Sequence, residues 1–300
     1  MSEPDARKDS YYGMSVINPP VWAEREIAGY LFLGGLAGGS SILAVVADMT
    51  KRPRLASRMQ LTASAAVTLS LVALIKDLGR PARFLNMLRV FKPTSPMNVG
   101  TWILTIYSPL NFVASASSVT GVAPIVGRMA GLGAGIGGGL VASYTGALIA
   151  DTAVPAWHTG HREMPFLFAG SAAMAAGGAG LLLAPRSENA PAWRFALIGG
   201  FGEIVTEVLL ENRLGPIKPA LTQGKAGGRM RMAKKLAVGG IAVAALLGRH
   251  NRLAAAGAGS ALLGASALTR FGIFEAGMES ARDPSFTVEP QRDRVRARQT

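Results

Sequence analysis

Cysteine is absent from this 300-residue chain, and histidine occurs only three times. Without cysteine the chain can form no disulfide and can ligate no iron–sulfur cluster through thiolates. A membrane haem needs paired histidines inside facing helices, whereas His158, His161 and His250 lie between the apolar runs. We therefore expect no haem, no iron–sulfur cluster and no metal site in this chain, so any electron transfer requires a diffusible carrier and a partner.

Charged residues are also few, at 16% of the chain against 49% hydrophobic residues. They gather between long apolar runs, and the first run, 27–47, contains no charged residue. A run of that length can cross the hydrocarbon core of a bilayer as a helix. The net charge of +13 comes from short basic segments beside these runs rather than from a basic soluble domain, so nucleic acid is not an expected partner.

The apolar runs predict an all-α, polytopic integral membrane protein with eight transmembrane helices packed as helical bundles. The polar flanks divide the chain into an N-terminal polar segment (1–26), an eight-helix membrane domain (27–269) and a C-terminal polar tail (270–300), expected to be extended or disordered after Arg282. The expected spans are Ile27–Ala47, Met59–Ile75, Val99–Thr120, Met129–Ala150, Met164–Pro185, Phe195–Leu210, Met232–Gly248 and Leu253–Thr269.

Lysine and arginine are unevenly distributed between the two sets of connecting segments. The set that contains both termini holds 22 of these residues and the other set holds 9. By the positive-inside rule this bias predicts a plasma-membrane protein with both termini in the cytoplasm.

Glycine is abundant and recurs at helix-packing intervals. Gly131, Gly135 and Gly139 lie four residues apart in the fourth expected span, and Gly34 and Gly38 do so in the first. Small residues at this spacing let membrane helices approach closely. We interpret these rows as packing surfaces and assign them no chemistry.

Several polar side chains near span ends could bind a ligand. Glu26 and Tyr30 lie one turn apart at the start of the first span, where a carboxylate and a phenol could flank a flat ligand or simply anchor the helix at the interface. Tyr144 lies inside the fourth span, where its hydroxyl needs a partner such as a quinone carbonyl or a backbone carbonyl. His158 could pass protons near the interface, or could be an ordinary solvated loop histidine.

Two further groups of charged residues are candidates for proton exchange or docking. Asp77, Arg80 and Arg83 follow the second span, where they could orient a docked protein or form a structural ion pair. Glu203 and Glu207 lie one turn apart in the sixth span, and Glu211 extends the row. Carboxylates at membrane depth are costly, so this row predicts a proton path, unless Glu207 is paired with a basic residue such as Arg213 or one from a neighbouring helix.

The sequence resembles the NrfD/PsrC family of membrane subunits of polysulfide-reductase-like molybdopterin oxidoreductases. The resemblance covers most of the chain and is most specific over 77–102. The segments that carry it are YYGM (11–14), PPVW (19–22), GGLAGGS (34–40), DLGRPARFLNMLRVFKPTSPMNVGTW (77–102), SYTGAL (143–148) and RFGIFEAGMESARDPSFTVEPQRDR (270–294).

The resemblance implies a cofactor-free helical subunit that binds menaquinone or ubiquinone in the bilayer. It implies electron exchange with a four-cluster, ferredoxin-like iron–sulfur subunit that serves a molybdopterin-type catalytic subunit. It also implies a quinone pocket on the docking face, lined by the first and fourth helices. Tyr144 matches the pocket tyrosine of the family, Tyr30 falls where a relative has a histidine, and Glu26 lies near a polar position. The chain alone is expected to catalyse no reaction.

Three hypotheses remain open at the level of sequence. The first is a quinone-reactive subunit of a respiratory oxidoreductase complex, with Glu26, Tyr30, Tyr144 and His158 around the quinone. The second is a proton- or ion-translocating subunit that uses Glu203 and Glu207. The third is a passive membrane anchor, which has no need for acids buried in the membrane.

Overall fold

The computed structural model describes residues 16–80 and 82–299, with side chains up to Arg292, so the YYGM segment and Pro81 lie outside the described residues. Within the described ranges the chain is helical and contains no strand. The predicted all-α fold is therefore confirmed.

Eight of the described helices have 20 residues or more, and each overlaps one expected span. They are α1 (Glu24–Met49), α2 (Pro53–Asp77), α4 (Pro96–Thr120), α5 (Pro124–Ala150), α7 (Met164–Leu183), α8 (Ala190–Leu214), α10 (Gly224–Leu247) and α11 (Arg252–Arg282). Proline in the first turn marks the start of α2, α4, α5, α7 and α8, because proline there gives up no helical hydrogen bond. Four helices, α1, α2, α5 and α7, are long and apolar enough to be candidate spans by length and composition. The total of eight crossings stays a prediction.

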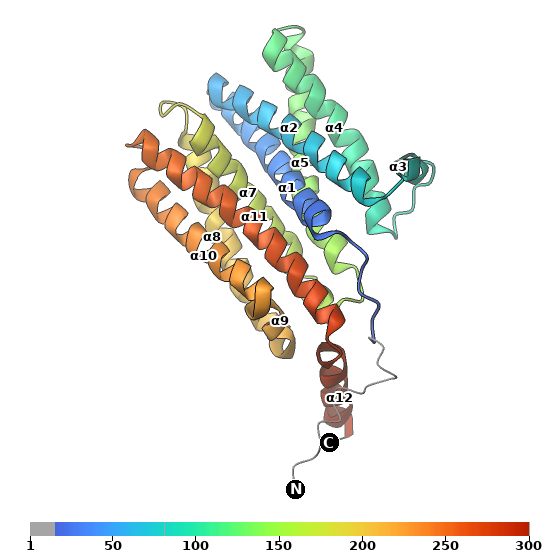
Figure 1. Ribbon diagram of the computed structural model, residues 1–300. Coiled ribbons are helices and arrows are strands. Elements are labelled where there is room, and N and C mark those ends of the chain that lie inside the picture. The colour runs from blue at the N-terminus through green and yellow to red at the C-terminus, as the bar shows by residue number, and fades with distance from the viewer. Residues whose placement is uncertain (1–15, 81, 300) are drawn as a thin grey trace.

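Short helices fill three connections between the long ones. They are α3 (Ala82–Met87), α6 (Pro155–Thr159), and the 3₁₀ turn Gly215–Ile217 with α9 (Lys218–Thr222). A further helix, α12 (Ser285–Gln299), follows α11. The long helices form two bundles of four (Figure 1). The first bundle contains α1, α2, α4 and α5, and the second bundle contains α7, α8, α10 and α11. Helix α1 lies between the bundles and packs against α7 and α11 as well as α2 and α5.

The closest approach between α1 and α5 is made by two glycines. A Cβ atom at Gly38 would lie 2.3 Å from the carbonyl oxygen of Gly138, and a Cβ at Gly138 would lie 2.5 Å from that of Gly38. Both positions therefore require glycine for the two backbones to touch. In the predicted row on α5, by contrast, Cβ atoms at Gly131 and Gly139 would meet no atom closer than 3.7 Å. Gly135, the middle member of the row, does pack against α1, since a Cβ atom there would lie 2.8 Å from Val45 Cγ2. The backbone contact itself is made by Gly138, which lies outside the row.

A buried hydrogen-bonded network joins α1, α2 and α4. The Asn111 side-chain amide donates to Ser41 Oγ and Tyr107 Oη, each at 2.9 Å, and those two oxygens lie 2.8 Å apart. Gln60 Nε2 donates to Asn111 Oδ1 at 2.9 Å. Because every one of these side chains is buried, the network satisfies polar groups that would be costly to leave unpaired in a membrane.

The C-terminal quarter differs from the sequence expectation at two points. Helix α11 continues beyond Thr269 to Arg282, so the expected eighth span ended too early. Arg270, counted with the polar tail, is instead fully buried inside the bundle. The tail also contains helix α12, so the expectation of an extended or disordered tail was wrong. The sequence prediction failed here because an arginine after an apolar run is typical of the end of a membrane span. Helices α10 and α11, the last two long helices, form a hairpin in which Asn251 caps the start of α11.

The glycine contact gives a matched pair of substitutions. Gly138→Ala should lower the thermal unfolding midpoint of the detergent-solubilised protein, because the added methyl group must push α1 and α5 apart at a cost of about 1–3 kcal/mol. Gly139→Ala should leave the midpoint within about 2 °C of the parent, since the same methyl group meets only Ile42 Cδ1, at 4.0 Å. Equal effects of the two substitutions on thermal unfolding would contradict the assigned contact.

Candidate functional site

A cavity of about 220 Å³ lies at the end of the bundle where α1 begins and α2 ends. Its walls are mainly apolar, and five helices and the segment before α1 contribute to them. The polar members of the lining are Trp22, Tyr30, Asp77, Arg83, Thr101 and Tyr144. We call this space the tyrosine cavity. Its volume is below the ~300–1,000 Å³ of pockets for drug-sized ligands, so it suits a single ring system rather than a whole lipid.

Two phenol groups meet in the tyrosine cavity. Tyr30 is buried on α1, Tyr144 is partly buried on α5, and both phenol side chains line the cavity. The Tyr144 ring sits directly against α4, where a Cβ atom at Gly100 would lie 1.8 Å from its Cζ and hydroxyl oxygen. Gly100 therefore leaves the space that the Tyr144 ring occupies. The structure thus brings together the two tyrosines that the sequence analysis singled out.

Asp77 and Arg83 also line the tyrosine cavity. Asp77 Oδ1 accepts a hydrogen bond of 3.1 Å from the backbone N–H of Ala23, which ties the segment before α1 to the end of α2. Arg83 donates through Nη1 to the carbonyl oxygen of Leu78. Arg80 is exposed and is not part of the lining. The predicted group of three is therefore split, with an acid and one arginine at the cavity.

Trp22 closes the cavity next to the second helix bundle. Its ring stacks on that of Trp157, with centroids 5.7 Å apart. Trp157 is fully buried, donates through Nε1 to the carbonyl oxygen of Ile273 at 2.8 Å, and fits against Gly277 of α11. The stacked pair links the cavity wall to α11, which belongs to the other bundle.

Two predicted residues, Glu26 and His158, do not line the tyrosine cavity. Glu26 forms an ion pair of 3.3 Å with Lys76 at the surface. The His158 side chain is exposed and stacks on that of His161, with ring centroids 5.8 Å apart. The α6 turn directs Trp157 inward and His158 outward, and sequence spacing alone does not reveal that choice. We leave both residues out of the site.

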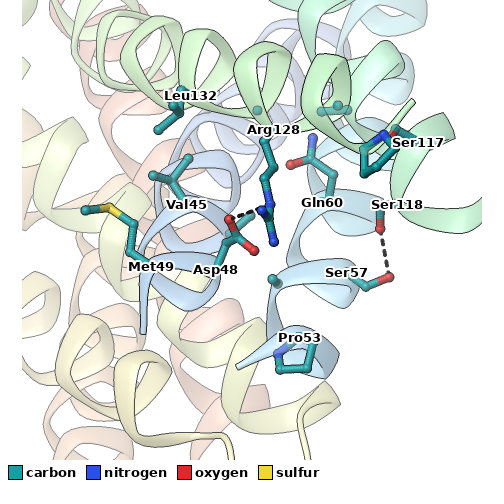
Figure 2. A pocket seen from close by; sticks show the side chains of 16 residues that line it. Val45, Asp48, Met49, Pro53, Ser57, Gln60, Ser117, Ser118, Arg128 and Leu132 are labelled. Atoms are coloured by element: carbon teal, nitrogen blue, oxygen red, sulfur yellow. Dashed lines mark hydrogen bonds and ion pairs between the residues drawn. The ribbon is translucent and has the colours of Figure 1, made fainter. Parts of the chain in front are cut away.

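A second cavity, of about 500 Å³, lies at the opposite end of the first bundle, between α1, α2, α4 and α5. Figure 2 shows Arg128 of α5 reaching toward Asp48 of α1, with an Nε–Oδ2 distance of 3.7 Å. Ser118 donates to Ser57 on one side of this cavity, and Gln60 forms part of its lining (Figure 2). The Gln60 amide nitrogen is already engaged by Asn111, and the ion pair is mostly exposed. No sequence expectation fell on this cavity.

Glu203 and Glu207 lie in the second bundle and not at either cavity. Glu203 is buried and accepts a hydrogen bond of 2.6 Å from Thr269 Oγ1. Glu207 lies 3.9 Å from Lys234 Nζ of α10, whereas Arg213 pairs with Glu163. The sequence left two interpretations of Glu207 open, a proton path and an ion pair with a basic residue. The structure shows the pairing, and the base comes from a neighbouring helix.

No cluster of three or more histidine, aspartate and glutamate side chains that could hold a metal ion occurs within the described ranges. Comparison with protein families gives a match to the family described as "Polysulphide reductase, NrfD" over residues 15–190, more than half of the chain. The chain belongs to the NrfD family. A search of curated proteins gave no match. Membership implies a membrane subunit of a quinone-linked oxidoreductase complex.

The matched NrfD region contains the whole lining of the tyrosine cavity. Sequence reasoning did not single out Trp22, Gly100 or Thr101, although all three lie in segments that carried the family resemblance, PPVW and the end of 77–102. An apolar or small residue at a helix start carries no chemical signal by itself. The contact of Gly100 with Tyr144, and the positions of Trp22 and Thr101 in the cavity wall, become visible only when the helices are packed together.

The bond between Asp77 and Ala23 can be tested in this NrfD chain by hydrogen exchange. Asp77→Ala should raise amide exchange in a peptide that covers residues 17–27, because a hydrogen bond to a charged group, worth about 1.5–3 kcal/mol, is lost. Asp151→Ala removes an exposed acid at the same end of the molecule and should leave that peptide unchanged. Unaltered exchange in both variants would show that the segment before α1 is held by other contacts.

Proposed function

We propose that this chain binds the head group of menaquinone or ubiquinone in the tyrosine cavity. It then exchanges electrons between the quinone pool and a partner iron–sulfur subunit. The single observation that carries the proposal is that the phenol side chains of Tyr30 and Tyr144 line the same ring-sized, mainly apolar cavity at one end of the bundle. A quinone offers two carbonyl oxygens as acceptors, and a phenol is a suitable donor to each.

The chemistry of the bound ring accounts for the other polar groups. Reduction of a quinone consumes two electrons and two protons, and oxidation of the quinol releases them. Asp77 lies in the cavity wall at the end of α2, so it can exchange protons between the ring and the outside. Tyr30 and Tyr144 would hold the ring through its oxygens. The isoprenoid tail has to leave the cavity, because the enclosed volume is too small to contain it.

Electrons have to come from or go to a redox group outside this chain, which has no cysteine to ligate a cluster. The segment that follows α2 supplies a docking surface beside the cavity. It carries the bases Arg80, Arg89 and Lys92, and the exposed apolar side chains of Val90 and Phe91. We propose that a four-cluster, ferredoxin-like subunit docks there and serves a molybdopterin-type catalytic subunit. The positive-inside rule, applied to the distribution of lysine and arginine, supports a cytoplasmic position for this face.

Tyr144→Phe tests the proposed hydrogen bond to the quinone. In the purified complex this substitution should lower quinone-coupled turnover roughly ten- to a hundredfold, the equivalent of one charge-assisted donor lost. Turnover with an artificial dye that accepts electrons at the partner should stay unchanged. Tyr107→Phe is the matched control, because Tyr107 hydrogen-bonds within the bundle and does not line the cavity. Unchanged quinone turnover in Tyr144→Phe would favour a passive membrane anchor.

Gly100→Ala tests the same site without removing a hydroxyl group. The added methyl group would occupy the place of the Tyr144 ring and displace it into the cavity. We expect the KM for quinone to rise at least about tenfold while turnover with the artificial dye is retained. Gly131→Ala, where the nearest atom would lie at 3.7 Å, should leave both values unchanged. A Gly100→Ala variant with normal quinone kinetics would mean that the ring binds elsewhere.

A further inference from the structure

A charged centre that the quinone site does not use lies deep in the second bundle. Arg270 of α11 is fully buried, and its guanidinium lies over the ring of Phe168, with 3.6 Å between Cζ and the ring centroid. Its Nη2 donates to the carbonyl oxygen of Phe168 at 2.7 Å. Its Nε and Nη1 have no hydrogen-bond partner among the described residues.

Glu203 of α8 has an unpaired acceptor, whereas Arg270 has unpaired donors, among the described residues. One carboxylate oxygen accepts from Thr269, the residue next to Arg270, but Oε2 has no partner within the described part of the chain. Both side chains are buried, and no ion pair of 4.0 Å or less joins these two described residues. Two donors and one acceptor are therefore held near each other at membrane depth without direct contact.

Such an arrangement is unfavourable in a dry interior. An unpaired buried polar group costs several kcal/mol, and in a membrane no solvent is available from the lipid side. Buried water with two to four polar partners is the usual way in which proteins satisfy such groups. Glu203 Oε2 and the free nitrogens of Arg270 supply the required donors and acceptor.

The same helix face connects this centre to the end of the bundle. Glu207 and Glu211 follow Glu203 at intervals of one turn, about 6 Å along the axis of α8. Lys234 Nζ lies between their carboxylates, at 3.9 Å from Glu207 and 3.8 Å from Glu211. Glu211 also pairs with Lys218 at 2.9 Å, at the end of the bundle where α8 ends. The ion pairs thus link the end of the bundle to Glu207, and Glu203 lies one turn further in, at a depth of about 16 Å.

We propose that Glu203, Thr269 and Arg270 hold internal water, and that the column of Glu207, Lys234 and Glu211 connects this water to the end of the bundle that carries the tyrosine cavity. The result is a hydrated, proton-accessible inlet that ends at Arg270, beside Gly35 of α1. Its ligand is water and the protons that water conducts. The inlet goes beyond the quinone site and would exist even if the tyrosine cavity bound nothing.

The absence of cysteine makes the inlet directly testable. In a chain without native thiols, one introduced cysteine gives a single S–H stretching band, and that proton exchanges for deuterium only where water reaches it. The experiment uses the full chain in liposomes, transferred to D₂O and followed by infrared spectroscopy. Thr269→Cys places the thiol at the proposed water. Ala265→Cys places it one turn away on α11, in the apolar cluster of the second bundle.

The thiol of Thr269→Cys should exchange at least about tenfold faster than that of Ala265→Cys, as expected for a hydrated site against a dry core. Glu207→Cys, one turn nearer the surface than Glu203, should exchange at least as fast as Thr269→Cys. Arg270→Met in the Thr269→Cys background should slow exchange, because it removes the donors that hold the water. Slow exchange at both Thr269→Cys and Glu207→Cys would show a dry centre and overturn the proposal. Equally fast exchange at Ala265→Cys would attribute the signal to general opening of the bundle and would overturn it too.

Discussion

The backbone contact between α1 and α5 at Gly38 and Gly138 is the constraint on which the proposed site depends. Because α1 and α5 run antiparallel and touch at that point, the contact fixes how the other residues of the two helices line up along the bundle axis. Tyr30 precedes Gly38 by eight residues, or about 12 Å, and Tyr144 follows Gly138 by six, or about 9 Å. Both therefore reach the same end of the bundle. A larger residue at either glycine would separate the helices and with them the two phenol groups.

Much of the helical layout could be predicted from the sequence, because long apolar runs and prolines at helix starts are strong local signals. All eight expected spans overlap long helices, and Tyr30, Tyr144, Asp77 and Arg83 meet at one cavity. The missed features share one cause. Gly100, Trp22 and Arg270 act through what lies opposite them on another helix, and periodicity along one helix does not report its neighbours. His158 does not line the cavity for a related reason, since its turn directs Trp157 inward instead.

Arg270 shows how membrane depth changes the meaning of a charge. In the sequence it looks like the end of an apolar run, and it adds to the positive bias of its side of the membrane. In the structure it is fully buried, with Phe168 over its guanidinium. Removing it from the count leaves the bias in place, so the predicted orientation does not depend on it.

The two bundles have different polar chemistry in their interiors. In the first, the neutral side chains of Ser41, Gln60, Tyr107 and Asn111 satisfy one another, so the network fixes helix register without charge. In the second, acids and bases run inward from one end and leave atoms of Glu203 and Arg270 unpaired. A closed neutral network beside an open charged column is consistent with separate roles, in which one bundle holds the ligand site in place and the other admits protons.

The most direct test of the central claim is a high-resolution map of the chain in its complex, prepared with an excess of quinone. The account predicts ring-shaped density in the tyrosine cavity, with a ring oxygen within hydrogen-bonding distance of the hydroxyl group of Tyr30 or Tyr144. Ring density in the cavity beside Gln60 and Arg128, with the space between the tyrosines filled by side chains, would contradict it.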